Sequence, residues 1–333
     1  MNTAGLLLPT FASLAAAGVL LALALVYRRR RAAGTIHPHD RSHVLAERFV
    51  KVTGQMRDGQ AAVQLAGAYA MAELADEWVE NRQLCIDALC AYLRGPLEPD
   101  PHGGATGAEQ PESRGGGEVS NAVIRLIAER LREDAAVSWQ GANLDFSGVI
   151  FDGGDFSGAV FSGGTVNFSS AVFSGDTIRF NLVEFAGGAI RFDLAKFSSG
   201  EVYFGGAVFS GGHVYFDDAE FTDCTVRLDY AEFSGSTVSF DKARFSGSRV
   251  RFDGTEFTGG TVSFDQTVFS GGVVNFDRTV FSGGIVDFRR AELSGATADF
   301  SDVADWSRPP IFDWGDTPPS GVYLPAANET APQ

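Results

Sequence analysis

Aspartate side chains recur at regular intervals in the second half of the chain, and stacked carboxylates of this kind could bind calcium. Within each of two sets, successive members are separated by two repeats of twelve. The sets are Asp193, Asp217, Asp241 and Asp265, and Asp229, Asp253 and Asp277. The Gly-Gly-x-Gly-x-Asp turn of calcium-binding β-helices is absent, however. We therefore favour the alternative that each aspartate accepts backbone N–H bonds of its own turn, and we predict no metal and no cofactor.

Cysteine and histidine residues offer weaker candidates for a metal site. Cys85 and Cys90 are five residues apart, so a helix would not place both on one face, and Cys224 lies far from them. No paired Cys-x-x-Cys occurs, which favours buried core cysteines and a reducing compartment. Three histidines lie close together before residue 44: His37, His39 and His43. Because no cysteine or fourth histidine accompanies them, a solvated linker is the better interpretation.

Groups that could act as catalytic acids, bases or nucleophiles do not converge in the sequence. His213 is the one histidine within residues 141–305, and the serines there stand in Ser-Gly turns without a His/Asp partner. An active site needs such groups in mutual contact, so we predict that the protein is not an enzyme. The net charge of −16 argues against direct nucleic-acid binding, which needs a basic face. An acidic chain suits basic partners instead.

A repeat of phenylalanine reveals the elements that must position these side chains. Between residues 141 and 305 the phenylalanines fall into two series, each with a period of twelve residues. The first series is Phe168, Phe180, Phe192, Phe204, Phe216, Phe240, Phe252, Phe264, Phe276, Phe288 and Phe300, with Leu228 replacing one member. The second is Phe173, Phe185, Phe197, Phe209, Phe221, Phe233, Phe245, Phe257, Phe269 and Phe281, closed by Leu293. A small or β-branched residue usually stands two positions earlier, on the same side of a strand. Each unit therefore predicts two short strands whose phenylalanines form an interior ladder.

The outward charges distinguish a coil of two repeats from a coil of one. With two repeats per coil, Lys196, Glu220 and Arg244 stack with alternating sign, whereas with one repeat Glu220 would stack on Glu232. Since stacked like charges are unfavourable, we predict a four-sided coil of about twenty-four residues. Roughly seven coils would form a rod on the order of 30 Å long. The predicted fold class is therefore mainly β, a parallel β-helix over residues 141–305.

The amino terminus has the length and composition of a membrane anchor. Residues 1–27 carry no charged side chain, and residues 5–27 are dominated by Leu, Ala and Val, enough to cross about 30 Å of hydrocarbon. Four arginines follow directly: Arg28, Arg29, Arg30 and Arg31. A cleaved signal peptide is the alternative, but it would place its positive residues before the apolar stretch. We predict that residues 1–31 anchor a single-pass protein in the inner cell membrane, with a short N-terminus outside and the bulk in the cytoplasm.

Helices and a linker are predicted between the anchor and the repeats. Residues 40–95 read as a small helical segment, in which an amphipathic helix over residues 42–56 precedes helices capped by Asp58 and Asn81. Residues 96–117 are rich in Gly, Pro, Glu and Ser, which predicts a disordered linker.

Both ends of the repeat array need protection from solvent. Residues 118–140 predict an amphipathic helix that covers the open first coil. Residues 306–333 predict a cap containing Trp306, Phe312 and Trp314, followed by a disordered Pro-rich tail.

The chain resembles the pentapeptide-repeat proteins, whose unit is written A(D/N)LXX. Residues 142–148, Ala-Asn-Leu-Asp-Phe-Ser-Gly, match that unit, and Ala-x-Phe recurs afterwards. The resemblance implies a right-handed quadrilateral β-helix, although every second corner here is two residues longer than in the family. Residues 48–49, 64–70 and 89–94 are similar to the helical segment of membrane-anchored actinobacterial pentapeptide-repeat proteins. The resemblance is specific for the fold and weak for the function.

These observations predict a membrane-tethered, non-enzymatic protein-interaction scaffold that presents a β-helix surface in the cytoplasm. The predicted partner is an unidentified protein, and a homodimer is compatible with this role. The alternative, implied by the resemblance, is an acidic DNA mimic that binds DNA gyrase or another DNA-binding protein. Arginines interrupt the acidic surface and count against mimicry, among them Arg179, Arg191, Arg227, Arg249, Arg251, Arg278, Arg289 and Arg290.

Overall fold

The computed structural model describes residues 38–95, 117–175, 177–198, 200–315 and 317–326. Parts of the prediction lie outside these residues: the anchor over residues 5–27, the arginines Arg28–Arg31, His37, the linker up to residue 116 and the last seven residues of the tail. None of the helices in the described part is both long and apolar enough to span a membrane. The chain divides into two compact units, residues 1–51 and 52–333.

Helices form the amino-terminal part of the described chain. α2 (Pro38–Met56) crosses the boundary between the units, and the second unit contains α3 (Ala61–Glu77), η1 (Val79–Asn81), α4 (Arg82–Arg94) and α5 (Glu118–Leu131). The small residues of α3 permit close approach, because a Cβ at Gly67 would lie 2.9 Å from the backbone nitrogen of Met56. Helices α3, α4 and α5 pack on one another and form a common core.

The helix ends differ from the prediction at three places. Asp58 does not cap α3, which begins at Ala61; its Oδ1 accepts the Gln60 N–H at 2.9 Å and so closes the turn before the helix. Asn81 occupies the N-cap position of α4, but its side chain makes no capping hydrogen bond. Helix α5 ends at Leu131, so it is shorter than the predicted residues 118–140.

Helix α5 ends before residue 140 because the following turn places Trp139 against the helices. Trp139 is only 1% exposed, and its Nε1 donates to Oδ1 of Asp76 on α3 at 2.9 Å. Arg130 of α5 donates to Oδ2 of the same carboxylate through Nε at 2.9 Å and Nη2 at 2.7 Å. The Arg130 Cζ lies 5.0 Å from the centroid of the Trp139 ring. The three side chains therefore join two helices to the start of the repeats.

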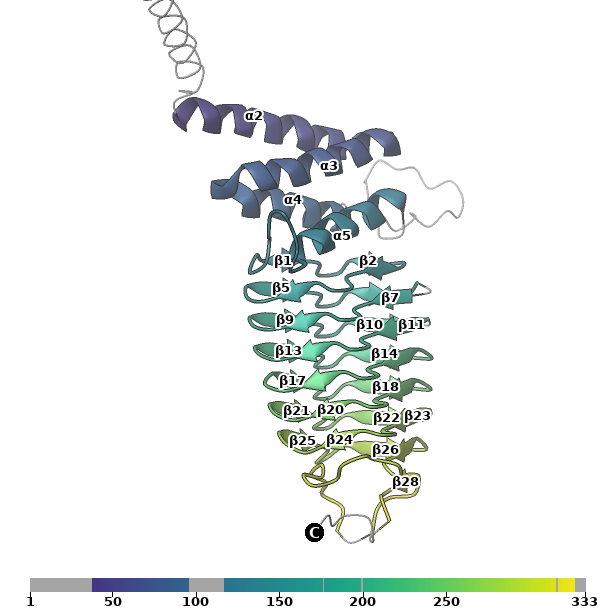
Figure 1. Ribbon diagram of the computed structural model, residues 1–333. Helices are drawn as coiled ribbons and strands as arrows, with labels where there is room; N and C mark the ends of the chain where they lie inside the picture. Colours follow the sequence, from purple (N-terminus) through teal and green to yellow (C-terminus); the bar gives the residue numbers. More distant parts are fainter. Residues whose placement is uncertain (1–37, 96–116, 176, 199, 316, 327–333) are drawn as a thin grey trace, which may run out of the picture. The chain divides into compact units, whose positions relative to one another are not determined.

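Residues 144–323 form a parallel β-solenoid of about seven turns, in which four sheets run along the stack of coils (Figure 1). Sheet I contains β1 (Leu144–Asp145), β5 (Thr165–Asn167), β9 (Ala189–Arg191), β13 (His213–Tyr215), β17 (Thr237–Ser239), β21 (Thr261–Ser263) and β25 (Ile285–Asp287). Sheet II contains β2 (Ile150–Phe151), β6 (Val172–Phe173), β10 (Lys196–Ser198), β14 (Glu220–Thr222), β18 (Arg244–Ser246), β22 (Val268–Ser270) and β26 (Glu292–Ser294). Sheet III contains β3 (Gly154–Asp155), β7 (Thr177–Arg179), β11 (Glu201–Tyr203), β15 (Thr225–Arg227), β19 (Arg249–Arg251), β23 (Val273–Asn275), β27 (Thr297–Asp299) and β28 (Val322–Tyr323). Sheet IV contains β4 (Val160–Phe161), β8 (Glu184–Phe185), β12 (Val208–Phe209), β16 (Glu232–Phe233), β20 (Glu256–Phe257) and β24 (Val280–Phe281).

The strand register confirms that one coil contains two repeats. Phe197 pairs with Phe221, and the outward residues Lys196, Glu220 and Arg244 stack in succession as predicted. The Lys196 Nζ lies 3.6 Å from Oε2 of Glu220. Four strands per coil, one in each sheet, also confirm the four-sided shape.

The first coil is shorter than the others. Leu144 pairs with Val166, whereas Val202 pairs with Val226, so the first step along the chain is two residues shorter than the later one. Phe146, Phe151, Phe156 and Phe161 are each five residues apart, so the corners of this coil lack the two additional residues found at every second corner later. A regular pentapeptide spacing therefore gives way to the alternating spacing within one turn.

The phenylalanine ladders fill the interior, as the sequence predicts. Every ladder phenylalanine is at most 5% exposed. Within one ladder the rings stack, as between Phe197 and Phe221, whose centroids are 4.5 Å apart with an interplanar angle of 2°. Rings of opposite corners meet edge to face, as between Phe168 and Phe180 at 6.0 Å and 88°. Both arrangements are favourable for aromatic pairs. Leu228 interrupts one ladder in its middle.

The first coil is covered by helices. Helix α4 packs on β1, and α5 packs on β3. The Gln83 side chain of α4 exchanges two hydrogen bonds with the Asn143 backbone, donating to the carbonyl at 2.7 Å and accepting from the N–H at 3.0 Å. It thereby satisfies backbone groups that an open coil would leave exposed.

The solenoid continues beyond the predicted end at residue 305. Val322 and Tyr323 form β28 and pair with β27, in a segment predicted to be a disordered tail. Trp306 closes the interior as predicted, with its ring edge-to-face on Phe281 at 5.4 Å, and Phe312 stacks on Phe288 at 5.5 Å. The β28 strand escaped prediction because it is only two residues long and surrounded by prolines.

Candidate interaction surface

One connected series of arginine, aspartate and tyrosine side chains lies on sheet III and the corner that follows it. Equivalent positions of successive strands stack directly, which places Arg179, Tyr203, Arg227 and Arg251 in one outward column. We call the following residues the arginine–aspartate ladder: Tyr203, Arg227, Asp229, Tyr230, Arg251, Asp253 and Arg278.

At its first step the ladder combines an aromatic ring with a guanidinium group. The Arg227 Cζ lies 5.5 Å from the centroid of the Tyr203 ring. The Arg227 Nη2 lies 3.2 Å from Oε1 of Glu201, and the Tyr203 hydroxyl donates to the same carboxylate. The hydrogen bond from Tyr203 is the largest cause that holds the pKa of Glu201 below its usual range, and it raises the pKa of Tyr203.

In the middle of the ladder two like charges are stacked and an aspartate separates them. Arg227 pairs in register with Arg251, an arrangement that is unfavourable by itself. Asp229 lies between them, with Oδ2 3.9 Å from Nη1 of Arg227 and Oδ1 3.3 Å from Nε of Arg251. Arg251 also reaches Asp253, where Nη2 and Oδ2 are 3.3 Å apart. Among the described residues, the buried Nε of Arg227 and Oδ1 of Asp229 form no hydrogen bond.

At its last step the ladder presents an exposed tyrosine. Arg278 binds Asp253 with two guanidinium nitrogens, Nε to Oδ1 at 3.0 Å and Nη2 to Oδ2 at 2.8 Å. Its Nη2 also donates to the Tyr230 hydroxyl at 3.3 Å, and its Cζ lies 5.9 Å from the centroid of that ring. The bond from Arg278 is the main cause that lowers the pKa of Asp253. Burial has the opposite effect on Asp229, whose pKa is raised.

Strained corner residues support the exposed side chains at the edge between sheets III and IV. Tyr230 has a φ of 59° and Leu182 a φ of 55°, in the left-handed region that costs roughly 1–2 kcal/mol for residues other than glycine. Tyr230 is nevertheless 63% exposed and Leu182 70% exposed. One coil further along, Gly206 follows Leu182 and Gly254 follows Tyr230. A Cβ at Gly206 would lie 2.9 Å from Leu182, and a Cβ at Gly254 would lie 2.8 Å from Tyr230. Along this edge, residues with large side chains therefore alternate with glycines.

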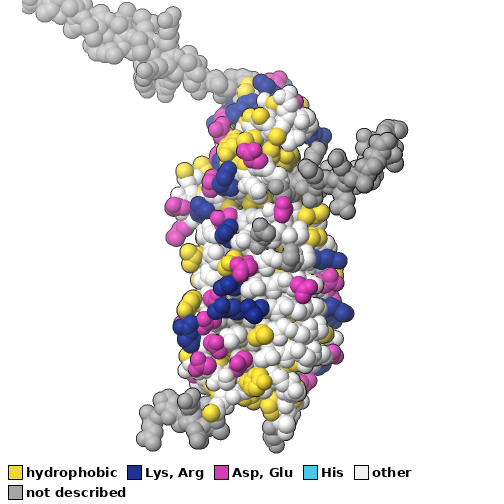
Figure 2. Space-filling model, turned by 90° about the vertical axis from the view of Figure 1, so that its right-hand side faces the viewer, with side chains coloured by type: hydrophobic (Ala, Val, Ile, Leu, Met, Phe, Trp, Pro, Cys, Tyr) yellow, Lys and Arg dark blue, Asp and Glu magenta, His cyan; other side chains and the backbone are white. Residues whose placement is uncertain are grey.

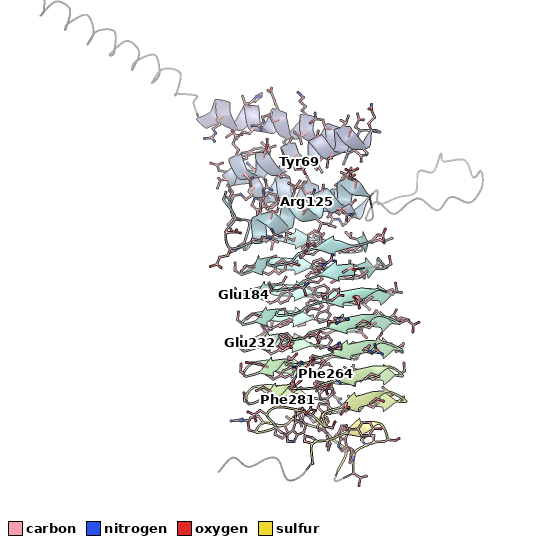
Figure 3. All side chains as sticks on the ribbon, turned by 45° about the vertical axis from the view of Figure 1, so that its right-hand side comes forward. Tyr69, Arg125, Glu184, Glu232, Phe264 and Phe281 are labelled. Atoms are coloured by element: carbon pink, nitrogen blue, oxygen red, sulfur yellow. The ribbon has the colours of Figure 1, made fainter. Side chains whose placement is uncertain are left out.

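Sheet IV, on the other side of the same edge, carries acidic side chains. Glu184, Glu232 and Glu256 point outward at equivalent positions, and Glu232 pairs in register with Glu256. Figure 3 shows Glu184 and Glu232 on one outer side of the coils, while Phe264 and Phe281 point inward. The charges of the solenoid are thus unevenly distributed between two adjacent sheets.

Most of the aspartates weighed as calcium ligands contact other side chains of the protein. Asp253 accepts bonds from Arg278, Asp265 from Arg290, with Nε to Oδ1 at 2.7 Å, and Asp241 from Ser263 at 2.5 Å. In the part of the chain that the structure describes, no three metal-binding side chains converge on one point.

The turn N–H bonds assigned to these aspartates are also accepted elsewhere. At Asp241, Asp265 and Asp277 the residue two positions earlier accepts the turn N–H, as when the Asp277 N–H donates to Oδ1 of Asn275 at 2.9 Å. Partial burial is the largest cause that raises the pKa of Asp217, and the neighbouring Asp241 and Asp193 raise it further.

The cysteines occupy the positions predicted for core residues. Cys85, Cys90 and Cys224 are buried and unpaired. Burial raises the pKa of Cys85 to about 11 and that of Cys90 to about 12, so these thiols are poor nucleophiles at neutral pH. His213 is exposed on sheet I, where its ring stacks on that of Tyr215 at 5.9 Å, and it takes no part in the ladder.

A polar cleft lies between α5 and the first coils. Its volume is about 650 Å³, and its lining includes Arg125, Glu129, Asp152 and Arg179. Charges of both signs surround it, and no histidine or cysteine belongs to its lining.

The arginines are recognisable in the sequence, but the ladder they form is not. In the sequence, Arg227, Arg251 and Arg278 indicate only interruptions of an acidic surface, and no pattern distinguishes Tyr203 and Tyr230. The coil of two repeats contains the missing signal, since it places Arg227 on Arg251 and Tyr230 next to Gly254. Figure 2 shows basic and acidic side chains intermixed on the side of the solenoid that it views, so no continuous acidic field covers that side.

The comparisons with known proteins agree with the solenoid architecture. Residues 146–190 and 216–268 match the family model described as pentapeptide repeats (9 copies). Among curated proteins and among solved structures, none matches the chain. The matched residues all lie within the four-sided coils. Over these two stretches the chain is therefore similar to pentapeptide repeats.

Proposed function

We propose that the protein is a membrane-tethered, non-enzymatic scaffold and that the arginine–aspartate ladder side of its solenoid binds another protein chain. The observation that carries this proposal is the ladder itself. Arginine and tyrosine are the residue types that most often dominate the energy of protein interfaces. Here they are held in place by aspartates, so binding would cost little further ordering of long side chains.

The ladder is also only partly satisfied within the chain. Tyr230 and Arg278 are exposed although a strained corner and a bidentate ion pair fix them. Strain that persists at an exposed position is a frequent mark of a functional site. A partner carrying carboxylates and an apolar side chain would complement the guanidinium groups and the tyrosine ring.

Tethering is supported by the sequence alone. The uncharged residues 5–27 and the arginines that follow favour a single membrane span with the solenoid in the cytoplasm. A tether would confine copies of the solenoid to one surface and raise their effective concentration.

The DNA-mimic alternative finds less support. A mimic needs a continuous acidic surface, and the ladder places three arginines along one edge of the solenoid. The proposal of a protein-binding scaffold therefore uses the arginines as contacts, whereas mimicry would have to tolerate them.

Two equivalent arginines provide a matched test. Arg278 and Arg290 both occupy left-handed corner positions and both bind the aspartate of the preceding coil, but only Arg278 belongs to the ladder. Full-length Arg278→Ala and Arg290→Ala chains would be cross-linked in cells with formaldehyde and purified, and the other protein chains retained per copy would be quantified. We expect Arg278→Ala to reduce retention at least about threefold and Arg290→Ala to leave it unchanged. Equal retention by both variants would contradict the proposal.

A further inference from the structure

Sheets III and IV carry complementary outward side chains in the same coil. The strand of sheet III is followed across one corner by the strand of sheet IV, so β7 precedes β8, β11 precedes β12 and β15 precedes β16. From β7 to β23, the last residues of successive sheet III strands are Arg179, Tyr203, Arg227, Arg251 and Asn275. From β8 to β24, the outward residues of sheet IV are Glu184, Val208, Glu232, Glu256 and Val280. In these coils, each arginine on sheet III is accompanied by a glutamate on sheet IV. The uncharged residues of sheet III, Tyr203 and Asn275, are each accompanied by a valine on sheet IV.

These complementary residues do not satisfy one another within the chain. Glu232 and Glu256 are stacked like charges, and neither has an ion-pair partner among the described residues. Arg227 and Arg251 are stacked like charges in the same two coils. Asp229 already offsets the arginine pair, whereas the stacked glutamates lack, within the described part of the chain, a counter-charge that arginines of another molecule could supply.

We propose that the partner of the ladder side is a second copy of this chain, with sheet III of one copy packed against sheet IV of the next. This inference rests on the proposed function and names its partner. The order of charges is matched best when the two solenoids lie parallel and in register. In that arrangement all three arginines meet glutamates: Arg179 with Glu184, Arg227 with Glu232, and Arg251 with Glu256.

Other registers lose this match. In the antiparallel arrangement centred on the middle coil, Arg179 would face Val280 and Arg251 would face Val208, so only Arg227 would meet a glutamate. An antiparallel arrangement shifted by one coil pairs two of the three arginines with glutamates and leaves the third unmatched. A parallel shift by one coil places Arg179 against Val208 and leaves one match. Because unpaired charges disfavour an interface, the in-register arrangement is selected. It also brings the amino-terminal ends of both solenoids to the same side, as tethers in one membrane would require.

The contact is heterologous, because two different faces meet. Sheets III and IV are adjacent sides of a four-sided coil, so successive copies would turn by roughly a right angle and a ring would close at about four copies. The flat face is on the order of 300 Å² per copy, from strands of three residues and a strand separation near 4.8 Å. Such an area is well below that of a standard stable interface, so association depends on the full, tethered chain.

Thiol cross-linking between two differently tagged full-length chains tests this arrangement. One chain carries Arg249→Cys on sheet III and the other Glu256→Cys on sheet IV, both at exposed positions in the same coil. The three native cysteines are buried and give little background. With a short bismaleimide we expect a cross-linked pair of the two tags. The control replaces Arg249→Cys by Arg244→Cys, an exposed position of sheet II in the preceding strand, and should give no pair. Two chains that both carry Arg249→Cys should also give none.

A charge reversal extends the test without touching the ladder. Glu232→Arg in the chain that carries Glu256→Cys should lower the cross-linked yield at least about fivefold. Equal yields from Arg249→Cys and Arg244→Cys, or no yield from Arg249→Cys in chains whose native thiols stay protected, would overturn the second-copy inference. The latter result, together with a loss of other retained proteins in Arg278→Ala, would leave the proposed function standing with a different partner. If Arg249→Cys gives no cross-link and Arg278→Ala retains other proteins as well as the unaltered chain does, both the second-copy inference and the proposed function are rejected.

Discussion

The Tyr230 ring lies against Gly254, and a Cβ at position 254 would be only 2.8 Å from two of its carbon atoms. The glycine therefore provides the space into which the exposed end of the ladder fits. Arg278 contacts the same ring and binds Asp253. Because Gly254 has no side chain, Tyr230 can occupy this position and contact Arg278, which in turn binds Asp253.

Gly254→Ala should destabilise the solenoid more than a matched glycine substitution. Both Gly254 and Gly148 have a left-handed φ, 63° and 67°, but a Cβ at Gly148 meets nothing within 4 Å. Gly148→Ala should cost roughly 1–2 kcal/mol of unfolding free energy from the backbone alone. Gly254→Ala should cost more because Tyr230 must move off its arginine. Urea unfolding of the two variants would measure the difference, and equal costs would refute the contact.

Leu228→Phe should stabilise the solenoid by completing an interrupted ladder. Phe204 precedes this position by one coil and Phe252 follows it, so a ring at 228 could stack on both. Each additional aromatic pair is worth about 1 kcal/mol. The reverse change, Phe216→Leu, should destabilise by a similar or larger amount, since it breaks stacking with Phe192 and Phe240. Thermal unfolding of both variants distinguishes ladder completion from simple overpacking, which would lower the melting temperature of Leu228→Phe.

Asp217→Asn should stabilise the protein at neutral pH and have little effect in acid. Burial and two acidic neighbours raise the folded-state pKa of Asp217, so the folded protein holds this proton more tightly than the unfolded chain does. The stability it contributes is complete below the unfolded pKa and is lost as pH rises through the folded pKa. The gain from asparagine should be below about 1 kcal/mol, because the side chain is only partly buried. Unfolding curves across this pH range would show it, and a gain that grows toward low pH would reverse the assigned sign.

Asp253 should show the opposite dependence. Arg278 lowers its folded-state pKa, so the stability it contributes is present above the unfolded pKa and is lost as pH falls through the folded value. Arg278→Ala should therefore reduce stability at neutral pH and leave it nearly unchanged in strong acid. A uniform loss at all pH values would indicate that packing rather than charge is responsible.

The three thiols should be protected in the folded protein. Burial raises the pKa of Cys85 to about 11 and that of Cys90 to about 12, and it also raises the pKa of Cys224. Alkylation at pH 8 should be slow for all three and become rapid only after denaturation. Cys224, within the coils, and Cys90, within the helices, would report separately on the two parts. Rapid labelling of Cys224 alone would contradict the buried ladder around it.

The sequence predicts the repetitive part of this molecule well because one period decides the position of every ladder residue. Once two repeats are assigned to each coil, the pairing of Phe197 with Phe221 and of Lys196 with Glu220 follows. The same arithmetic places Glu232 on Glu256, a like-charge pair that the alternating charges of sheet II do not anticipate.

The parts without a period were harder to predict. Asp76, Arg130 and Trp139 meet although 54 and 63 residues separate the arginine and the tryptophan from the aspartate, and no local pattern encodes such a contact. The strand at Val322 likewise depends on pairing with Ala298, which lies in the preceding coil. Predicting the arginine–aspartate ladder would require the directions of the side chains as well as the strand register, because Asp229 contacts arginines on two coils.

A scan of photo-cross-linking around a single coil tests the central claim most directly. Benzoylphenylalanine would replace, one at a time in the full-length chain, the outward residues Arg249 on sheet III, Glu256 on sheet IV, Thr261 on sheet I and Val268 on sheet II. All four lie within one turn, so they differ only in the face they occupy. The proposed binding surface predicts adducts with another protein chain from positions 249 and 256 and few from 261 and 268. Equal labelling from all four faces, or labelling confined to sheets I and II, would contradict it.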